Sequence, residues 1–316
     1  MRIEELTHVV DRLNTEVGKA IVGKEKVLEK VLITILSNGH LLFEDVPGLA
    51  KTLMAKSFAA SLGCKFTRVQ FTPDLLPADI TGTHIFDRKT SDFVLREGPV
   101  FTNILLADEI NRAPPKTQAA LLEAMQEKQT TLGGETIALP EPFIVLATQN
   151  PIEYEGTYPL PEAQIDRFLM RIDIGYPTRV EEKAIIDRRK TRRKDEVDID
   201  QIASPELVIE MQSAVEDIHV DDGIEEYIVE VVSRTRQHPQ VEIGSSPRGS
   251  LALFKLSKAR AAIHGRDFVI PDDVKDVAVP GLAHRIILKP DPWIKGVRTE
   301  SIVSEILEKV PVPKVD

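Results

Sequence analysis

The amino-acid sequence predicts an α/β fold, in which a mostly parallel sheet covered on both faces is followed by a smaller, mainly helical domain. In the first half of the chain, short apolar runs alternate with segments of helical periodicity, which is typical of buried parallel strands joined by helices. After Tyr176-Pro177 the apolar residues recur at helical spacing and few strand signals remain. Because 316 residues exceed what one hydrophobic core usually serves, we expect two domains, at residues 1–177 and 178–316.

The predicted strands are rich in apolar residues, and the predicted helices carry their apolar residues on one face. The strands are HLLF (40–43), KFTRVQF (65–71), ILLAD (104–108), FIVLATQ (143–149) and FLMRIDI (168–174), and the helices between them are 51–62 and 117–127. In the second domain the expected helices are 180–194, 205–217, 223–237, 247–264, one that begins at PDDVKD (271–276) and one near 299–309.

Two segments interrupt the alternation of strands and helices. In 83–98 two short runs flank a polar turn, and in 129–139 the pair Gly133-Gly134 joins two short runs. A Gly-Gly pair readily adopts the positive φ angles of tight hairpin turns, so the second segment is the stronger of two β-hairpin predictions. Each hairpin is either a plain connection or an element that projects from the domain.

The charge balance argues against a surface that binds nucleic acid. The formal net charge is −10 and the pI is about 5.3, whereas phosphate backbones are bound by clustered Lys and Arg. One basic run, RRKTRRK at 188–194, has acidic residues on both sides. This pattern favours the solvated face of a mixed-charge helix over the alternative, a local contact for a partner.

Cysteine content and hydropathy limit the class of protein further. Cys64 has no second cysteine to pair with, which excludes disulfides within one chain and favours a reducing compartment, and we expect it to be a small core residue. No uncharged apolar run reaches the roughly 18 residues that a membrane span needs. The charged start MRIEELTHVVDRL fits neither a signal peptide nor a transit peptide, so we expect a cytoplasmic protein.

The segment DVPGLAKT at 45–52 is a candidate phosphate-binding loop, because it follows an apolar run and precedes a helical pattern. In that setting backbone N–H groups and a helix N-terminus point at a phosphate. Gly48 would allow close backbone approach, Lys51 would supply a cation for the β- and γ-phosphates, and Thr52 would supply a hydroxyl for Mg²⁺.

This loop departs at two positions from the common pattern G-x-x-x-x-G-K-[ST], which has glycine where this chain has Asp45 and Ala50. A positive φ at Ala50 would carry a strain of about 1 kcal/mol, which a working site tolerates. For Asp45 the sequence offers no explanation.

Polar residues end two of the predicted strands. Asp108 is expected to face a bound Mg²⁺, and Glu109, on the opposite side of the pleat, to polarise a water for attack on the γ-phosphate. The next strand ends in Gln149 and Asn150, whose amides would lie beside the acids if the two strands are neighbours. Taken alone, the acid pair is better explained as a solvated strand end, and Asn150 as a turn former before Pro151; their combination with the phosphate loop favours the functional interpretation.

The order of these motifs resembles that of the MoxR family of AAA+ ATPases, over roughly residues 15–290. The resemblance rests on IVGKEKV (21–27), DVPGLAKT (45–52), FTPDLLPADITG (71–82), LLADEINRAPPKTQAALLEAMQE (105–127), the Gly-Gly hairpin, ATQNPIEYEGTYPLPEAQIDRF (147–168) and GSSPRG (244–249). It implies an AAA+ P-loop domain and a smaller helical lid. The family also accepts alanine before the lysine of the loop, as at Ala50.

The resemblance also implies roles for individual residues, with ATP and Mg²⁺ as cofactors. Asp108 and Thr52 would hold the metal, Glu109 would activate water, and Asn150 resembles the sensor 1 residue. Arg167, in DRF, resembles the arginine finger that reaches a neighbouring subunit's ATP, and Arg248, in SPRG, resembles the sensor 2 arginine of the lid. Arg112 is a further candidate for the subunit interface. The segment Ile21, Val22 and Gly23 resembles the lining of the adenine pocket, and the nucleotide loop comprises Asp45, Val46, Pro47, Gly48, Leu49, Ala50, Lys51, Thr52 and Leu53.

By this resemblance the chain forms a homo-oligomeric ring, most simply a hexamer, that remodels or matures protein clients, including by metal or cofactor insertion. Any von Willebrand factor A domain partner would be a separate chain, since no DxSxS motif is present. Two alternatives stay open: a DNA-acting motor, which would need basic hairpins, and an ATP-gated switch with slow turnover, in which Asp45 places a negative charge near the phosphates.

Overall fold

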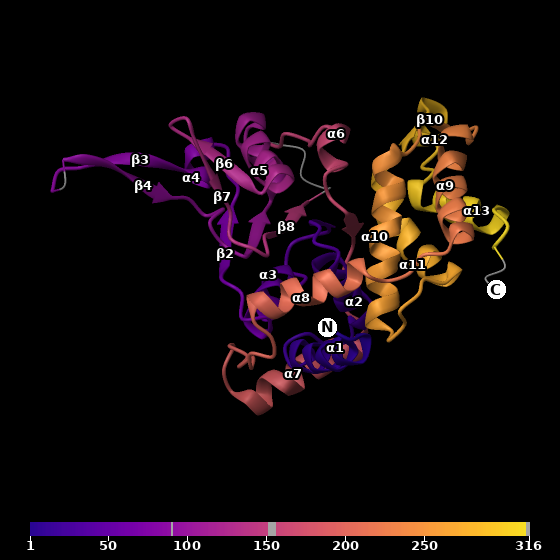
Figure 1. Ribbon diagram of the computed structural model, residues 1–316, viewed down its shortest axis with the longest axis horizontal. Coiled ribbons are helices and arrows are strands. Elements are labelled where there is room, and N and C mark those ends of the chain that lie inside the picture. The colour runs from indigo at the N-terminus through magenta and orange to yellow at the C-terminus, as the bar shows by residue number, and fades with distance from the viewer. Residues whose placement is uncertain (90, 151–155, 314–316) are drawn as a thin grey trace.

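The computed structural model describes residues 1–89, 91–150 and 156–313, which form a layered α/β body and a group of C-terminal helices (Figure 1). Positions 90, 151–155 and 314–316 lie outside the described residues. Parts of the first hairpin turn and of the motif at 147–168 therefore lie outside them too.

Five parallel strands form the central sheet in the order β2-β5-β8-β1-β9. Their bounds are β1 (Leu41–Glu44), β2 (Phe66–Gln70), β5 (Ile104–Asp108), β8 (Ile144–Gln149) and β9 (Met170–Ile172). All five predicted strands are confirmed, although the last is shorter than 168–174. Since β5 pairs with β8 in parallel, the acids and the amides do end on neighbouring strands.

Both faces of the inner strands β1, β5 and β8 are buried, and successive residues of a strand belong to different hydrophobic clusters. In β1, Leu41 and Phe43 pack in the cluster that contains residues of α1 (Ile3–Gly18), α2 (Glu25–Leu36) and α3 (Lys51–Ser61). Leu42 packs on the other face, in the cluster that contains residues of α4 (Pro77–Thr81) and α5 (Pro115–Glu127). Burial on both faces explains why the strand sequences are continuous apolar runs.

Both predicted hairpins are present. The first pairs β3 (Gly82–Asp87) with β4 (Asp92–Glu97) and extends far from the body of the protein in Figure 1. The second pairs β6 (Gln129–Leu132) with β7 (Glu135–Ala138), and its turn glycines have φ angles of +60° and +91°.

Helices dominate the chain after residue 178, and several begin with a proline that follows a Ser cap or an extended residue. They are α7 (Arg179–Arg192), α8 (Pro205–Glu216), α9 (Asp222–Gln237), α10 (Pro247–Ile263), α11 (Pro271–Leu282), α12 (Pro290–Ile294) and α13 (Thr299–Lys309). A small antiparallel pair, β10 (Val241–Ile243) and β11 (Ile287–Leu288), was not predicted, nor were α6 (Glu162–Ile165) and the 3₁₀ turns η1 (Ile110–Arg112) and η2 (Ala283–Arg285).

The C-terminal helices lie in two places in Figure 1. Helices α9 to α13 form one group, whereas α7 and α8 lie against the α/β body, where Arg188 of α7 donates a hydrogen bond to the carbonyl oxygen of Gly18 at 2.6 Å. The domain boundary after residue 177 therefore stays a prediction. Neighbouring basic residues of α7 pair locally, as Arg189 does with Asp195, which agrees with the solvated mixed-charge face.

The structure also bears on the expected core position of Cys64 and on the expected lack of a membrane span. Cys64 is buried, and burial raises the pKa of its thiol to about 12, as suits a core residue. Across the residues that the structure describes, no helix combines the length and the apolar character needed to cross a membrane.

Candidate functional site

A cavity of about 420 Å³ lies where the phosphate loop, the start of α3 and the ends of three strands meet. Parallel strands bring their carboxyl ends to one edge of the sheet, and open α/β sheets bind ligands there. The predicted residues that line this cavity are Asp45, those at 47–53, Asp108, Glu109 and Asn150. Most of the site predicted from sequence is thus brought together in one place.

The phosphate loop reaches α3 through a left-handed turn. Ala50, the residue before the helix, has φ 60° and ψ 19°, and Gly48 has φ 86°. The positive φ predicted at Ala50 is therefore present, with its cost of about 1 kcal/mol for a residue that carries a Cβ. The backbone at this turn directs the N-terminus of α3 at the cavity, which favours an anion.

Lys51 lies across the mouth of the loop. Its Nζ donates a hydrogen bond to the carbonyl oxygen of Asp45 at 2.6 Å. Burial lowers the pKa of Lys51, while the nearby carboxylates of Asp45, Asp108 and Glu109 act in the opposite direction. The ammonium group is therefore held half-buried beside the space that a phosphate would occupy.

Asp45 ties the loop to the chain segment that follows β9. Its Oδ2 accepts hydrogen bonds from the backbone N–H groups of Ile174 at 2.7 Å and Gly175 at 2.8 Å, and its Oδ1 accepts one from Val46 at 2.8 Å. Glycine at this position could make none of these bonds. The departure from the common loop pattern thus has a structural reason that the sequence did not reveal.

Asp108 is held by two side chains that the sequence analysis missed. Its Oδ1 accepts a hydrogen bond from Thr148 Oγ1 at 2.6 Å, and its Oδ2 accepts from Arg68 Nη2 at 2.7 Å and Nε at 3.1 Å. Arg68 lies on β2, whose residue Gln70 is in register with Asp108. Two residues apart on one strand lie on the same face, so the signal was the pattern R-x-Q on a strand beside β5.

The expectation that Glu109 lies on the opposite side of the pleat from Asp108 is wrong. The strand ends at Asp108, and Glu109 has φ 55° and ψ 50°, a left-handed conformation that breaks the alternation of side chains. Both acids consequently line the same cavity. Glu109 Oε2 accepts hydrogen bonds from Gln70 Nε2 at 2.7 Å and from Arg112 Nη1 at 3.1 Å.

Two side chains of the cavity fit as ligands of a divalent cation that also binds the phosphates of a nucleotide. Thr52 and Asp108 supply a hydroxyl and a carboxylate in the same cavity. Among the described residues, no group of three or more His, Cys, Asp or Glu side chains is placed so that it could hold a metal ion. Mg²⁺ typically takes few protein ligands and completes its shell with phosphate oxygens and water, as these donors would require.

Arg167 and Arg248 lie elsewhere. They line a separate cavity of about 250 Å³, together with His40, Leu169, Lys255 and Arg285 among others, and neither lines the phosphate cavity. Arg167 Nη1 donates to the carbonyl oxygen of Leu122 at 2.8 Å, and its buried Nε has no hydrogen-bond partner within the part of the chain that the structure describes.

The segment predicted to line the adenine pocket does not reach the phosphate cavity. Ile21 is buried in the core, and Gly23, with φ 66°, lies so close to Glu181 that a Cβ there would be 2.0 Å from its Oε1. Val46 lines a neighbouring cavity of about 390 Å³, which also includes Arg171 and residues of α11. An adenine role for these residues stays a prediction.

Comparisons with known proteins agree with this geometry. A family model described as "ATPase family associated with various cellular activities (AAA)" matches residues 40–170, and an "AAA lid domain" model matches residues 233–306, called the lid below. A crystal structure of a Cytophaga hutchinsonii protein described as an ATPase superposes with a TM-score of 0.93 at 41% identity, covering 99% of this chain and 97% of that chain.

Curated proteins also match nearly the whole chain. Protein YeaC of Bacillus subtilis is 48% identical over 98% of this chain and 97% of its own length. Chaperone MoxR1 of Mycobacterium tuberculosis is 43% identical over 98% of this chain and 84% of its own length. The phosphate loop, the acid pair, the helical lid and this full-length similarity together show that the chain belongs to the MoxR family of AAA+ ATPases.

Proposed function

We propose that this AAA+ ATPase hydrolyses ATP with Mg²⁺ in a homo-oligomeric ring, most simply a hexamer, and uses the energy to remodel or mature protein clients. The observation that carries the proposal is the separation of the two halves of the site. Lys51 and Glu109 line one cavity, whereas Arg167 and Arg248 line another. This separation supports a site that is completed by a neighbouring subunit, with Arg167 as the arginine finger and Arg248 of the lid beside it.

Within the phosphate cavity each residue has a defined task. Lys51 and the loop N–H groups bind phosphate oxygens, Thr52 and Asp108 hold the metal, and Mg²⁺ when bound neutralises charge on the phosphates. Glu109 orients and deprotonates the attacking water, helped by the amide of Asn150. Gln70 and Arg112 hold the Glu109 carboxylate in place at 2.7 and 3.1 Å.

The arginine pair explains why assembly would control turnover. Positive charge beside the γ-phosphate stabilises the transition state, and an arginine supplied in trans contributes a factor of about 10³ to 10⁵ in other NTPases. In this proposal an isolated subunit lacks that arginine at its own site, because its Arg167 lines the other cavity, where Nη1 donates to the carbonyl oxygen of Leu122 at 2.8 Å.

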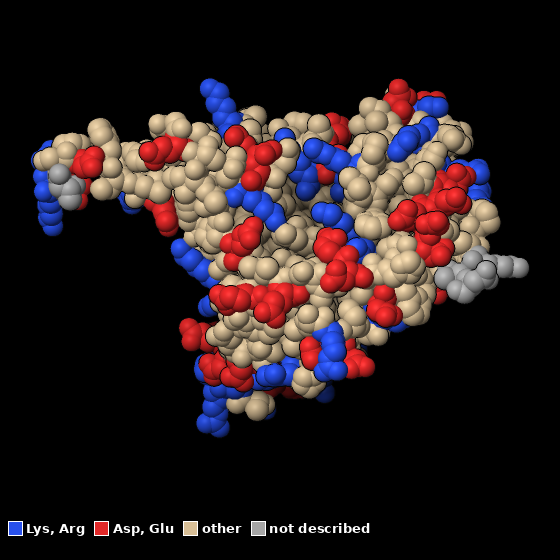
Figure 2. Space-filling model, in the orientation of Figure 1, with Lys and Arg blue, Asp and Glu red and all other residues tan. Residues whose placement is uncertain are grey.

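The hairpin β3–β4 supports a protein client over a nucleic acid. Its exposed surface includes the apolar residues Ile85, Phe86, Phe93 and Val94, and the rings of Phe86 and Phe93 lie 5.4 Å apart. In Figure 2 the projecting hairpin is mostly uncharged and carries both acidic and basic groups. A DNA-acting motor would need a basic surface there. The metal or cofactor insertion and the separate von Willebrand factor A domain partner suggested by the resemblance belong to the same proposal.

A slow ATP-gated switch receives less support. In that alternative the Asp45 carboxylate would repel the phosphates, yet its oxygens already accept hydrogen bonds from three backbone N–H groups. The presence of Glu109 beside the metal ligands also suits hydrolysis.

The test is ATP turnover per subunit measured against protein concentration, for the parent protein and for Lys51→Ala and Arg167→Ala alone and mixed. We expect turnover to rise with concentration, each variant to be inactive, and the mixture to regain activity because Lys51→Ala subunits donate intact fingers. Mixtures that assemble but stay inactive would show that the site is not shared between subunits. ATP turnover per subunit that does not depend on protein concentration would show the same. A hexamer predicts a sedimentation mass of six subunits.

A further inference from the structure

A buried lid arginine holds the backbone on both sides of Arg167. The side chain of Arg285, on η2, is 3% exposed. Its Nη1 donates to the carbonyl oxygen of Asp166 at 2.8 Å, and its Nη2 donates to that of Phe168 at 2.8 Å. These two carbonyls flank Arg167, so the single guanidinium of Arg285 fixes the backbone position of Arg167.

The same contact joins the two arginines of the second cavity. Asp166 forms an ion pair with Arg285 through Oδ1, while its Oδ2 lies 3.6 Å from Arg248 Nη1 and 3.4 Å from Ser246 Oγ, the N-cap of α10. The carboxylate therefore lies between the lid arginine Arg248 and the loop that carries Arg167.

His284 and the end of α11 add further contacts between the lid and the loop at 166–168. His284 lies with Nε2 3.0 Å from the carbonyl oxygen of Phe168, and Arg285 Nε donates to the carbonyl oxygen of Gly281 at 2.8 Å. All the nitrogens of the buried guanidinium thus have acceptors. A buried cation is stable only when it is paired in this way, so the lid and the loop at 166–168 hold one relative position.

We propose that Arg285 is a positioning residue for the trans arginines: it fixes Arg167 and Arg248 as one unit, which the lid presents to the neighbouring subunit's nucleotide. The inference rests on the proposed function, since it assumes that Arg167 acts in a neighbouring site. Arg285 itself lies in the second cavity and has no contact with the phosphate cavity of its own subunit.

The test is a set of subunit mixtures that distinguishes a displaced finger from a damaged site. Arg285→Met should bind ATP as the parent does, because its own phosphate cavity is untouched, and should turn over about 10²-fold more slowly, as expected for a misplaced catalytic group. Mixed with Lys51→Ala, which has an intact finger, it should regain activity. Mixed with Arg167→Ala, which has none, it should not.

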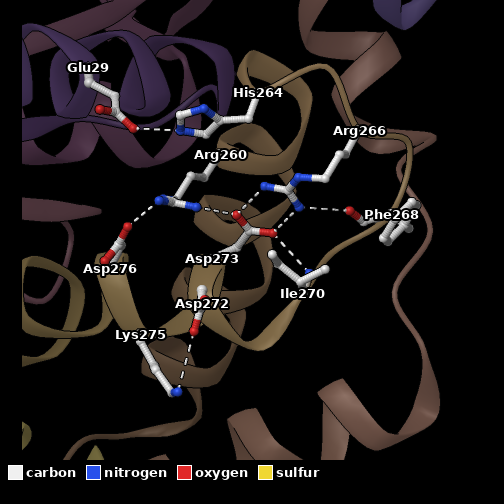
Figure 3. A network of polar contacts seen from close by, with 10 residues as sticks. All are labelled: Glu29, Arg260, His264, Arg266, Phe268, Ile270, Asp272, Asp273, Lys275 and Asp276. Atoms are coloured by element: carbon white, nitrogen blue, oxygen red, sulfur yellow. Dashed lines mark hydrogen bonds and ion pairs between the residues drawn. The ribbon is translucent and has the colours of Figure 1, made fainter. Parts of the chain in front are cut away.

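A control variant is available elsewhere in the lid. Figure 3 shows Asp273 of α11 between Arg260 and Arg266, and Arg266 donates to its two carboxylate oxygens at 2.5 and 2.7 Å. The described contacts of Arg266 are with Asp273 and Phe268, away from residues 166–168. Arg266→Met therefore removes a lid arginine without releasing the finger, and its turnover should stay within about threefold of the parent's while Arg285→Met falls.

The outcomes separate the inference from the function on which it rests. If mixing Lys51→Ala with Arg167→Ala restores no ATP turnover, the shared site is wrong, and the inference that rests on it is wrong too. If they complement but Arg285→Met is rescued by Arg167→Ala, or is not rescued by Lys51→Ala, Arg285 does not position the finger. Arg285→Lys, which keeps a cation for Asp166 but loses the fork to both carbonyls, should show the same mixing pattern more weakly and serves if the Met variant does not fold. Parent-like turnover of folded Arg285→Lys together with folded Arg285→Met would overturn the proposal.

Discussion

The carboxylate of Asp45 accepts a hydrogen bond from the backbone N–H of Gly175 at 2.8 Å, and this bond joins the phosphate loop to the segment after β9. Replacing Asp45 with glycine restores the first glycine of the common loop pattern but leaves the N–H groups of Ile174 and Gly175 without this acceptor. We predict that Asp45→Gly lowers the free energy of unfolding by about 2 kcal/mol, measured by urea denaturation.

Asp45→Asn is the matched control for this loop, because its amide oxygen can still accept a hydrogen bond from the segment after β9. It should lose less stability than Asp45→Gly. A glycine variant as stable as the parent would show that the hydrogen bonds between Asp45 and residues 174–175 contribute nothing to the free energy of unfolding.

Glu109 is expected to activate the attacking water. Glu109→Gln keeps the shape of the side chain and an oxygen that can accept from Gln70, but it removes the basic carboxylate. We predict unchanged ATP affinity and turnover lower by about 10²- to 10⁴-fold, measured by nucleotide binding and steady-state phosphate release. Glu123→Gln, on the exposed surface of α5, should leave both values unchanged. Parent-like hydrolysis by Glu109→Gln would remove Glu109 from the mechanism.

Arg68 pairs with the carboxylate oxygen of Asp108 at 2.7 Å, so it competes with a divalent cation for that oxygen. Because the Arg68 side chain is 47% exposed, water screens the pair and its effect is small. We predict that Arg68→Gln lowers the Mg²⁺ concentration needed for half-maximal ADP binding by about two- to fivefold, measured by calorimetric titration. Arg68→Lys, which keeps the charge, should change it less. A higher Mg²⁺ requirement in Arg68→Gln would mean that Arg68 assists the metal.

His40 makes stability depend on pH. Its Nδ1 accepts the N–H of Val145 at 3.0 Å, so its Nε2 carries the proton toward the carbonyl oxygen of Met125, and the neutral ring satisfies both partners. Burial lowers the pKa of His40 from 6.5 to about 4. Between these values the unfolded chain binds a proton at this ring that the folded chain does not, so stability falls as the pH falls from 6.5 to 4, by up to about 3 kcal/mol.

The measurement is the urea midpoint at several pH values between 4 and 7.5, for the parent and for His40→Gln. The variant should be less stable at neutral pH, because it loses part of the hydrogen bonding, but its loss of stability toward low pH should be smaller. The buried His284, whose pKa burial also lowers, keeps some pH dependence in both proteins. Identical pH profiles for parent and variant would contradict the assignment to His40.

The sequence by itself determined the five strands of the sheet, most of the C-terminal helices, the phosphate loop and the pair of acids. Each of these is encoded locally: continuous apolar runs predict strands buried on two faces, helical spacing predicts the C-terminal helices, and a lysine and a threonine at a helix start predict a phosphate site. The hairpin at Gly133-Gly134 was found for the same reason, since its turn depends on two adjacent residues.

Only the tertiary structure decided which distant side chains meet. Arg68 reaches Asp108 because β2 lies beside β5, Asp45 is explained by Gly175 more than a hundred positions away, and Arg285 holds Asp166 from the lid. The side of the strand taken by Glu109 was also predicted wrongly, because one left-handed residue reverses the alternation. Strand order, register and single backbone torsions are set by the packing of the whole chain, and periodicity along a single segment carries no record of them.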